Sequence, residues 1–180
     1  MRTITVVSGC PGTGKTTIAS ALAAADPLGV HLESDVFFDF FAHRILSIRP
    51  EAHEQNGAAV RAAAAAAAAF ATSGYQVVVD GVLGPWFVPT FLDGVAPSGL
   101  MVEYVVLRAP LDDTLRRALP RPRGDQAEQE EIVRHMHRGF EDLGRFEKHA
   151  VETGGHGIPQ TLATVAERRF RGDFLLAPTV

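Results

Sequence analysis

Cysteine, lysine and long apolar runs are scarce in this sequence of 180 residues, and each shortage excludes a class of protein. The single cysteine, Cys10, has no partner in the chain, so a fold stabilised by intramolecular disulfides is excluded. The alanine run from Ala62 to Ala69 is too short and too weakly hydrophobic to span a membrane. No signal peptide is recognised at the start of the chain. We therefore expect a soluble protein of the cytoplasm, without a membrane partner.

Positive charge is not in excess either. Lysine and arginine together number 17, against 21 for aspartate and glutamate, which gives a formal net charge of -4. Nucleic-acid-binding proteins usually carry a basic excess, so a nucleic-acid partner is disfavoured unless the basic residues are clustered locally. The length and a hydrophobic content of 46% indicate one globular domain over residues 1–180.

Only two lysines are present, Lys15 and Lys148, and the first belongs to a glycine-rich segment. Residues 9–16 read Gly-Cys-Pro-Gly-Thr-Gly-Lys-Thr and fit the pattern G-x-x-x-x-G-K-[ST] at every fixed position. The glycines let backbone N–H groups point at phosphate oxygens, the lysine reaches the β- and γ-phosphates, and the hydroxyl of Thr16 suits Mg²⁺. A strand-like run precedes the segment, and a helix follows whose positive end would face the same anion. The segment predicts that a nucleoside triphosphate is bound by Gly9, Cys10, Pro11, Gly12, Thr13, Gly14, Lys15, Thr16 and Thr17.

Apolar runs alternate with helical patterns along the chain, which predicts a three-layer α/β domain with a mostly parallel sheet. Strands are expected at residues 3–8, 30–33, 75–80, 101–107 and 149–153. Helices are expected at residues 17–25, 36–48, 54–73, 111–119, 126–148 and 159–169. The fifth of these is expected to break near Gly139 or Gly144. The alanine run lies in the third helix, where it favours close packing against the sheet.

Three carboxylates lie where the second and third expected strands end, and ligands of open parallel sheets bind beyond such ends. Asp35 is placed to orient an acceptor hydroxyl and take its proton, although the same position also suits a helix N-cap. Glu33 is expected to face Mg²⁺ through a water molecule. Asp80 closes an apolar strand; it either holds Mg²⁺ or its waters, together with Thr16, or contacts hydroxyl groups of the acceptor.

Four arginines surround a predicted helix end and a proline-flanked loop, namely Arg116, Arg117, Arg121 and Arg123. A mobile lid over residues 111–138 would let them neutralise the charge that spreads over the γ-phosphate during transfer while excluding water. The alternative is an exposed basic helix end that interacts with its own dipole. The sequence does not distinguish which arginine reaches the phosphate; we assign Arg117 and Arg121 to catalysis, and Arg116 and Arg123 to nucleotide binding.

Aromatic residues follow the same two strands. Phe37, Phe40 and Phe41 share one face of the helix expected there, which indicates a core position, whereas Phe38 points elsewhere. Phe38 and Trp86 are therefore candidates for the apolar wall of an acceptor pocket. The seven histidines show no metal-binding spacing, so no metal besides Mg²⁺ is expected.

A resemblance to small P-loop kinases rests on the loop at 9–17 combined with three further segments, namely Ser34-Asp35, Val79-Asp80-Gly81 and Leu115-Arg116-Arg117-Ala118-Leu119. The chain resembles the group of AAA-type ATP-binding proteins that includes chloramphenicol phosphotransferase and the kinase domain of polynucleotide kinase. Zeta toxins, gluconate kinases and shikimate kinases are similar at a greater distance. The likeness covers most of the chain in order and spacing, but only the loop is a specific motif.

The resemblance implies the P-loop NTPase fold, with a five-stranded parallel sheet in the order 2-3-1-4-5 and helices on both faces. It also implies ATP and Mg²⁺ as cofactors, Asp35 as the carboxylate that activates the acceptor hydroxyl, and the region from Arg116 to Arg123 as the lid. The residues 33–35 stand where some relatives carry Asp-x-Asp, so the metal role of Glu33 is not carried over. No substrate motif is recognised.

We therefore expect an ATP- and Mg²⁺-dependent phosphotransferase that moves the γ-phosphoryl group to a hydroxyl of a small molecule, such as an antibiotic or other secondary metabolite. One alternative is a nucleic-acid 5′-end kinase, against which the acidic net charge counts. The other is a non-catalytic, nucleotide-dependent switch protein, which the short chain without an appended interaction domain disfavours. The sequence does not identify the acceptor.

Overall fold

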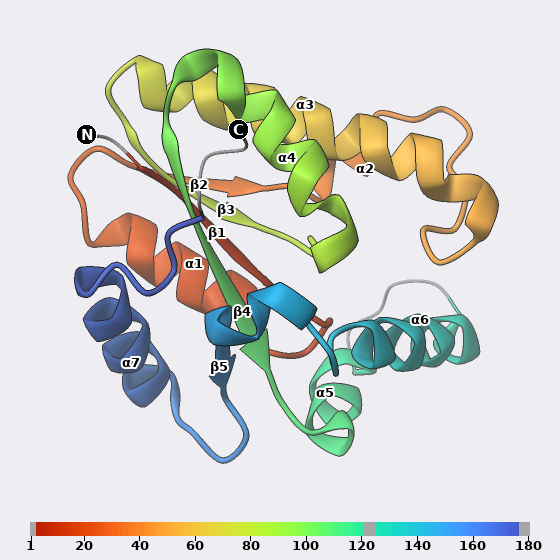
Figure 1. Ribbon diagram of the computed structural model, residues 1–180. Coiled ribbons are helices and arrows are strands. Elements are labelled where there is room, and N and C mark those ends of the chain that lie inside the picture. The colour runs from red at the N-terminus through yellow and green to blue at the C-terminus, as the bar shows by residue number, and fades with distance from the viewer. Residues whose placement is uncertain (1–2, 121–124, 177–180) are drawn as a thin grey trace.

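The computed structural model describes residues 3–120 and 125–176 and has three layers, with a sheet between two layers of helices (Figure 1). The sheet consists of β1 (Thr3–Gly9), β2 (Gly29–Glu33), β3 (Gln76–Asp80), β4 (Met101–Arg108) and β5 (Ala150–Glu152). These strands pair in parallel, in the order β2-β3-β1-β4-β5. The predicted fold class and strand order are confirmed.

Helices cover both faces of the sheet (Figure 1). One face is covered by α1 (Lys15–Ala24) and α7 (Ile158–Phe170), the other by α3 (His53–Thr72) and α4 (Val88–Val95). Beyond the carboxyl ends of the strands lie α2 (Val36–Asp39), α5 (Leu111–Ala118) and α6 (Gln126–Gly139). Four 3-10 segments complete the structure, η1 (Pro50–Ala52), η2 (Pro85–Phe87), η3 (Ala96–Ser98) and η4 (Gly144–His149).

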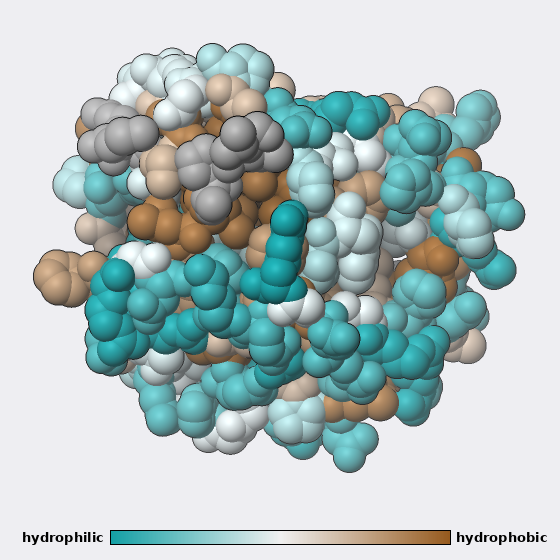
Figure 2. Space-filling model, in the orientation of Figure 1, coloured by the Kyte–Doolittle hydropathy of each residue, from teal (hydrophilic) through white to brown (hydrophobic). Residues whose placement is uncertain are grey.

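The outer surface over α5, α6 and α7 is mainly hydrophilic in the view of Figure 2. This agrees with helices that bury one face and expose the other. Among the helices that lie in the described residues, none has the combination of length and hydropathy that a membrane span requires.

Both faces of the central strands are buried, and this explains their nearly continuous apolar sequence. Alternate residues of β3 enter different cores. Val77 and Val79 belong to the core that the alanines of α3 complete, whereas Val78 packs in the core that contains Ile18 of α1. The same alternation decides which side chains at the strand ends face α1.

The carboxyl ends of β1, β2 and β3 are joined at one edge of the sheet. Val7 and Glu33 both pair in register with Asp80. Ser34 N donates to Asp80 O at 2.7 Å, and Gly81 N donates to Val7 O at 3.4 Å. The segments that follow β1, β2 and β3 therefore start close together at the carboxyl edge of the sheet.

The helix predicted over residues 36–48 is wrong in length, because α2 ends at Asp39. The segment that follows is held in an irregular path by α3. The side chain of Gln55 accepts a hydrogen bond from Ile45 N and donates one to His43 O, both at 3.0 Å. Side-chain hydrogen bonds from a neighbouring helix thus replace the helical ladder that the local pattern favoured.

The prediction that Phe37, Phe40 and Phe41 all lie in the core is also wrong. Phe37 packs against the core, but Phe40 is 74% exposed and meets the ring of Phe37 edge-on at 5.8 Å between centroids. A helix of four residues spans about one turn, so it cannot present all three rings on one face.

The break predicted near Gly139 or Gly144 is found at both residues. The last residue of α6 is Gly139, after which Phe140 N donates to Met136 O at 3.1 Å and to His137 O at 3.0 Å. The 3-10 segment η4 begins at Gly144, whose φ of 55° is in the left-handed region that glycine adopts most easily. The chain then returns to the sheet as β5.

The alanine run of α3 permits a close crossing with α4. The buried alanines of the helix include Ala63, Ala64 and Ala67. A β-carbon added at Gly94 of α4 would lie 2.7 Å from Ala64 Cβ, so the two helices leave no free space there. Small side chains at this position are therefore required by the packing.

Ala64→Leu is expected to lower the free energy of unfolding by about 1–3 kcal/mol, because the larger side chain overpacks the crossing. Ala65→Leu, on the exposed side of the same helix, is expected to stay within about 0.5 kcal/mol of the original protein. Urea unfolding followed by circular dichroism measures both. Equal effects of the two changes would contradict the crossing.

Candidate active site

The glycine-rich segment forms a loop between β1 and α1 in which all three motif glycines have positive φ. Gly9, Gly12 and Gly14 have φ of 144°, 89° and 92°, and no other type of residue in the described part of the chain has a positive φ. Thr13 closes a turn inside the loop, since its N–H and its hydroxyl both donate to Cys10 O, at 3.3 Å and 2.9 Å. The loop has the backbone conformation that its motif predicts.

Close neighbours also require two of the glycines. A β-carbon at Gly9 would lie 2.3 Å from Leu107 O of β4, and one at Gly12 would lie 2.4 Å from Thr114 O of α5. A β-carbon at Gly14 would meet nothing within 4 Å, so the backbone conformation alone requires glycine there. The loop is therefore supported by β4 and by the first helix of the predicted lid.

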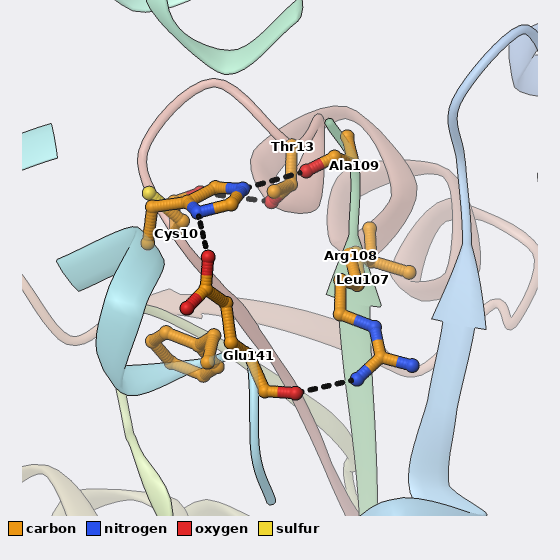
Figure 3. A pocket seen from close by; sticks show the side chains of 8 residues that line it. Cys10, Thr13, Leu107, Arg108, Ala109 and Glu141 are labelled. Carbon is orange, nitrogen blue, oxygen red and sulfur yellow. Dashed lines mark hydrogen bonds and ion pairs between the residues drawn. The ribbon is translucent and has the colours of Figure 1, made fainter. Parts of the chain in front are cut away.

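A small pocket lies between the loop, the end of β4 and the end of α6 (Figure 3). Its wall consists of Cys10, Thr13, Leu107, Arg108, Ala109, His137, Phe140 and Glu141. His137 Nε2 lies 3.1 Å from Ala109 O, and its Nδ1 lies 3.5 Å from Glu141 Oε1. Because these polar atoms already have partners, we interpret the pocket as part of the packing of α6 against the loop.

Cys10 connects the loop to α6. The residue is 2% exposed, and its Sγ donates to Val133 O at 3.4 Å. Burial raises the pKa of the Cys10 thiol to about 12, against the opposing effect of the positive charge of Lys15. The thiol is therefore protonated at neutral pH and acts as a donor to α6 rather than as a nucleophile.

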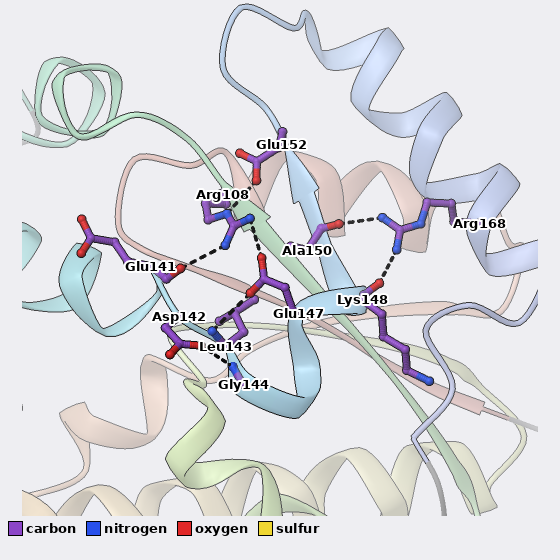
Figure 4. Close-up of polar contacts among 10 residues, drawn as sticks. All are labelled: Arg108, Glu141, Asp142, Leu143, Gly144, Glu147, Lys148, Ala150, Glu152 and Arg168. Atoms are coloured by element: carbon purple, nitrogen blue, oxygen red, sulfur yellow. Dashed lines mark hydrogen bonds and ion pairs between the residues drawn. The ribbon is translucent and has the colours of Figure 1, made fainter.

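Arg108, at the end of β4, links three further segments (Figure 4). Its Nε lies 2.6 Å from Glu152 Oε1 of β5, and its Nη2 lies 2.7 Å from Glu147 Oε1 of η4. Its Nη1 donates to Glu141 O at 3.3 Å, just after α6. The hydrogen bond from Arg108 holds the pKa of Glu147 below its ordinary value. These contacts fix the end of α6 to the sheet.

The first turn of α1 presents polar groups that have no partner in the described residues. The N-cap is Gly14, which has no side chain to satisfy the amides of the first turn. Lys15 is half-buried, Thr16 and Thr17 are exposed, and no described residue pairs with their side chains. Backbone amides, an ammonium group and a hydroxyl at a helix N-terminus form a donor set suited to a polyphosphate.

Asp80 is buried at the end of β3, with one carboxylate oxygen unpaired. The residue is two positions from Val78, which packs against α1, so its side chain lies on the α1 face of the sheet. Asp80 Oδ2 is 3.5 Å from His31 Nε2, whereas Oδ1 has no hydrogen-bond partner among the described residues. A buried acceptor without a partner is costly and marks a place for water or an ion.

The residue types at this edge fit Mg²⁺. Nowhere in residues 3–120 and 125–176 do three His, Cys, Asp or Glu side chains group so as to hold a metal by themselves. Mg²⁺ commonly takes one or two protein ligands and completes its coordination with substrate phosphates and water. Asp80 Oδ1 and the hydroxyl of Thr16 are ligands of that kind, and Glu33 lies opposite Asp80 in register. The metal roles of these three residues remain predictions.

Asp35 occupies the N-cap position directly before α2, but its side chain makes no capping hydrogen bond. Its Oδ1 lies 3.7 Å from the place that a β-carbon on Gly81 would take, and Gly81 directly follows Asp80. No described residue pairs with the carboxylate. The structure therefore places the Asp35 carboxylate beside the end of β3, while its role as a base remains a prediction.

The arginines of α5 differ in their contacts. Arg116 is paired with Asp113, one turn earlier in the same helix, at 2.6 Å. Arg117 has no partner in the described residues and lies one turn after Thr114, whose carbonyl approaches the loop. The contact of either arginine with a nucleotide remains a prediction. Two further arginines lie outside the described residues, Arg121 and Arg123.

The two aromatic residues predicted for the acceptor pocket contact different parts of the structure. Phe38 is half-buried, with the guanidinium carbon of Arg44 at 5.4 Å from its ring centroid. Trp86 is 48% exposed and covers Gly84 and Gly139, where an added β-carbon would lie 2.3 Å and 2.8 Å from the indole. Trp86 therefore joins the segment after β3 to the end of α6. Its contact with an acceptor remains a prediction.

Two polar residues at this edge were missed from the sequence, His31 and Asn56. His31 is two positions before Glu33 in a strand, so the alternation of side chains could have placed both on one face. Asn56 is 8% exposed; its Nδ2 donates to Ser47 O at 2.8 Å, but its Oδ1 has no partner in the described residues. A polar residue among the buried glycine, alanine and valine residues of α3 was the signal for it.

Comparison with protein families assigns the chain to one family. Residues 6–135 match the AAA domain family, which covers most of the chain, and the protein belongs to this family. The predicted relation to AAA-type ATP-binding proteins is confirmed at that level, while the narrower likeness to chloramphenicol phosphotransferase remains a prediction. No curated protein sequence matches the chain.

Several solved structures share the fold over nearly the whole chain. A sugar kinase from a Janibacter species is 19% identical, with 93% of each chain covered and a TM-score of 0.68. The tunicamycin resistance protein of Deinococcus radiodurans is 19% identical, with 99% of this chain and 100% of that chain covered and a TM-score of 0.62. Shikimate kinase from Acinetobacter baumannii is 17% identical, with 96% and 94% covered and a TM-score of 0.52. At these identities the likeness shows a kinase-like P-loop fold and leaves the substrate open.

Cys10 is expected to react with a chromogenic disulfide reagent at pH 8 at least about 100-fold more slowly in the folded protein than in urea, because burial suppresses the thiolate. The chain has no other cysteine, so the absorbance reports this thiol alone. Fast labelling of the folded protein at neutral pH would contradict the contact between the loop and α6.

Proposed function

We propose that the protein is an ATP- and Mg²⁺-dependent phosphotransferase that moves the γ-phosphoryl group of the nucleotide to a hydroxyl of a small molecule. One observation carries the proposal: a phosphate-binding loop and two carboxylates with unpaired oxygens, Asp35 and Asp80, lie at the carboxyl edge of one parallel sheet. Ligands of such sheets bind at this edge. Membership in the AAA domain family supports the nucleotide as the first substrate.

The nucleotide is bound by the loop and the first turn of α1. The amides of residues 12–16 face the phosphates, and the ammonium of Lys15 pairs with the β- and γ-phosphates. When bound, Mg²⁺ would neutralise charge on these phosphates, with Thr16 and Asp80 as protein ligands and Glu33 acting through water. The cradle is held by packing against β4 and α5, and donors fixed in this way stabilise charge more than donors that must first reorganise.

Asp35 orients the acceptor and takes its proton. The acceptor oxygen forms a bond to the γ-phosphorus while the bond from that phosphorus to the β–γ bridging oxygen breaks. The hydroxyl proton passes to the Asp35 carboxylate, and ADP leaves with the bonding electron pair. No described residue forms a hydrogen bond or ion pair with the Asp35 carboxylate, so it can accept a hydrogen bond from the acceptor hydroxyl.

Arg117 is the described arginine best placed to stabilise the transferred phosphoryl group. It lies on α5, the helix that contacts the loop, and no described partner holds its guanidinium. A guanidinium at this position neutralises the equatorial oxygens of the γ-phosphate in the transition state. The roles proposed for Arg116, Arg121 and Arg123 as further lid cations follow from the sequence alone.

The acceptor is proposed to be a hydroxyl-bearing small molecule such as an antibiotic or other secondary metabolite, with Phe38 and Trp86 as apolar walls. The names of three solved structures with this fold, a sugar kinase, a shikimate kinase and a tunicamycin resistance protein, support a small molecule in general. The formal net charge of -4 counts against a nucleic-acid end as acceptor.

Asp35→Asn is expected to lower phosphoryl transfer by at least about 100-fold, because the amide cannot take the proton, while ATP affinity stays unchanged. Transfer is measured with γ-labelled ATP and a panel of alcohols, and the products are identified by mass spectrometry. Asp39→Asn is the matched control, since Asp39 ends the same short helix and its partner among the described residues is the exposed Arg44. Full transfer by Asp35→Asn would remove Asp35 from the mechanism.

Lys15→Met is expected to weaken ATP binding by about 10- to 100-fold, as the loss of a charge-assisted hydrogen bond implies. Isothermal titration calorimetry measures the affinity. The other lysine of the chain, Lys148, is exposed, and Lys148→Met is expected to leave the affinity for ATP unchanged. Equal affinities of the two variants would count against the loop as the nucleotide site.

A further inference from the structure

His31 is the one described side chain in ion-pair contact with Asp80. His31 Nε2 is 3.5 Å from Asp80 Oδ2, and the two side chains are 20% and 4% exposed. His31 Nε2 has no hydrogen-bond partner among the described residues, nor has Asp80 Oδ1. A buried carboxylate oxygen and a buried imidazole nitrogen lie next to each other, and neither has a hydrogen-bond partner among the described residues. Packing alone does not explain this arrangement.

The strand register puts His31 where it can act on Asp80. His31 pairs with Val78 and Glu33 pairs with Asp80, so His31 and Asp80 are diagonal neighbours. Both side chains lie on the face of the sheet that α1 covers, as Val78 does. The hydrogen bond from Ser34 N to Asp80 O, at 2.7 Å, prevents the two strand ends from moving apart.

A carboxylate that ligates a metal through one oxygen needs that oxygen held in a fixed direction. Residues next to a metal ligand usually supply this by hydrogen bonding to the atom that the metal does not use, and their loss typically costs 10- to 100-fold in metal affinity. Around Asp80 the other polar groups of the α1 face include the carboxylate of Glu33, which cannot donate, and the first turn of α1. The hydroxyl of Thr5 on β1 also lies on this face, but it donates to Glu103 Oε2 at 2.8 Å. His31 is thus the donor available from the strand side.

We propose that His31 is a positioning residue that donates from Nε2 to Asp80 Oδ2 and thereby turns Asp80 Oδ1 toward the phosphate-binding loop, where Mg²⁺ or its water would be held. The proposal rests on the metal role of Asp80 in the proposed function. His31 does not contact the nucleotide or the acceptor. Its effect is on metal affinity and not on the chemical step.

The test compares His31→Leu with His31→Gln. Gln keeps an N–H donor at a similar distance from the backbone, whereas Leu has none. The dissociation constant for Mn²⁺ is measured by electron paramagnetic resonance on the protein–ADP complex, and ADP affinity is measured separately in EDTA. We expect Leu to weaken Mn²⁺ binding by about 10- to 100-fold and Gln by less than about threefold, with ADP affinity unchanged in both. In turnover, Leu should raise the Mg²⁺ concentration for half-maximal rate while leaving kcat at saturating Mg²⁺ unchanged.

Equal weakening by Leu and Gln, or weakening by neither, would overturn the proposal. His31→Ser, whose hydroxyl is too short to reach Oδ2, replaces Leu if that variant does not fold. Asp80→Asn separates this proposal from the function on which it rests. If Asp80→Asn weakens Mn²⁺ binding and His31→Leu does not, only the positioning role fails. If Asp80→Asn has no effect, the metal role of Asp80 fails as well.

Discussion

The structure depends on one constraint, the backbone conformation of the short loop between β1 and α1. The backbone needs glycine at positions 9, 12 and 14, because each has a positive φ. The loop ends in the first turn of α1, whose side chains and N-cap offer no partner to the amides of that turn within the described residues; such amides suit an anion like polyphosphate. The surrounding elements are arranged to hold that conformation, with the carbonyls of Leu107 and Thr114 pressed against two of the glycines.

The strand order brings different candidate groups to the two sides of the loop. The loop follows β1, the central strand, and β2 and β3 lie on one side of it while β4 and β5 lie on the other. The carboxylates of Asp35 and Asp80 come from the first side, and Arg117 comes from the helix that follows β4. A phosphoryl group held by the loop would thus have acids and acceptor on one side and cations on the other, which suits transfer to a hydroxyl. The two sides are joined across α6, where Cys10 donates to Val133 and Trp86 covers Gly139.

The parts of the fold that could be predicted from the sequence are those governed by local chemistry. The loop glycines, the apolar strands and the break in α6 each have a local cause, and the structure confirms them. The length of α2 could not be predicted, because the side chain of Gln55, from the next α-helix in the chain, forms hydrogen bonds with the backbone of residues 43 and 45. The exposure of Phe40 follows from that shortening. The partner of Asp80 was missed for a similar reason, since the pairing of His31 with Val78 depends on the register between two strands that are far apart in the sequence.

The central claim is that the loop binds the β-phosphate of a nucleotide, and calorimetry with ADP and AMP tests it most directly. Both ligands carry the same base and sugar, so any difference in affinity reports on the phosphate that the cradle is built to hold. We expect ADP to bind at least about 100-fold more tightly than AMP, which corresponds to about 2.7 kcal/mol for charge-assisted hydrogen bonds to one phosphate group. Equal binding of ADP and AMP, or no binding of ADP, would contradict it.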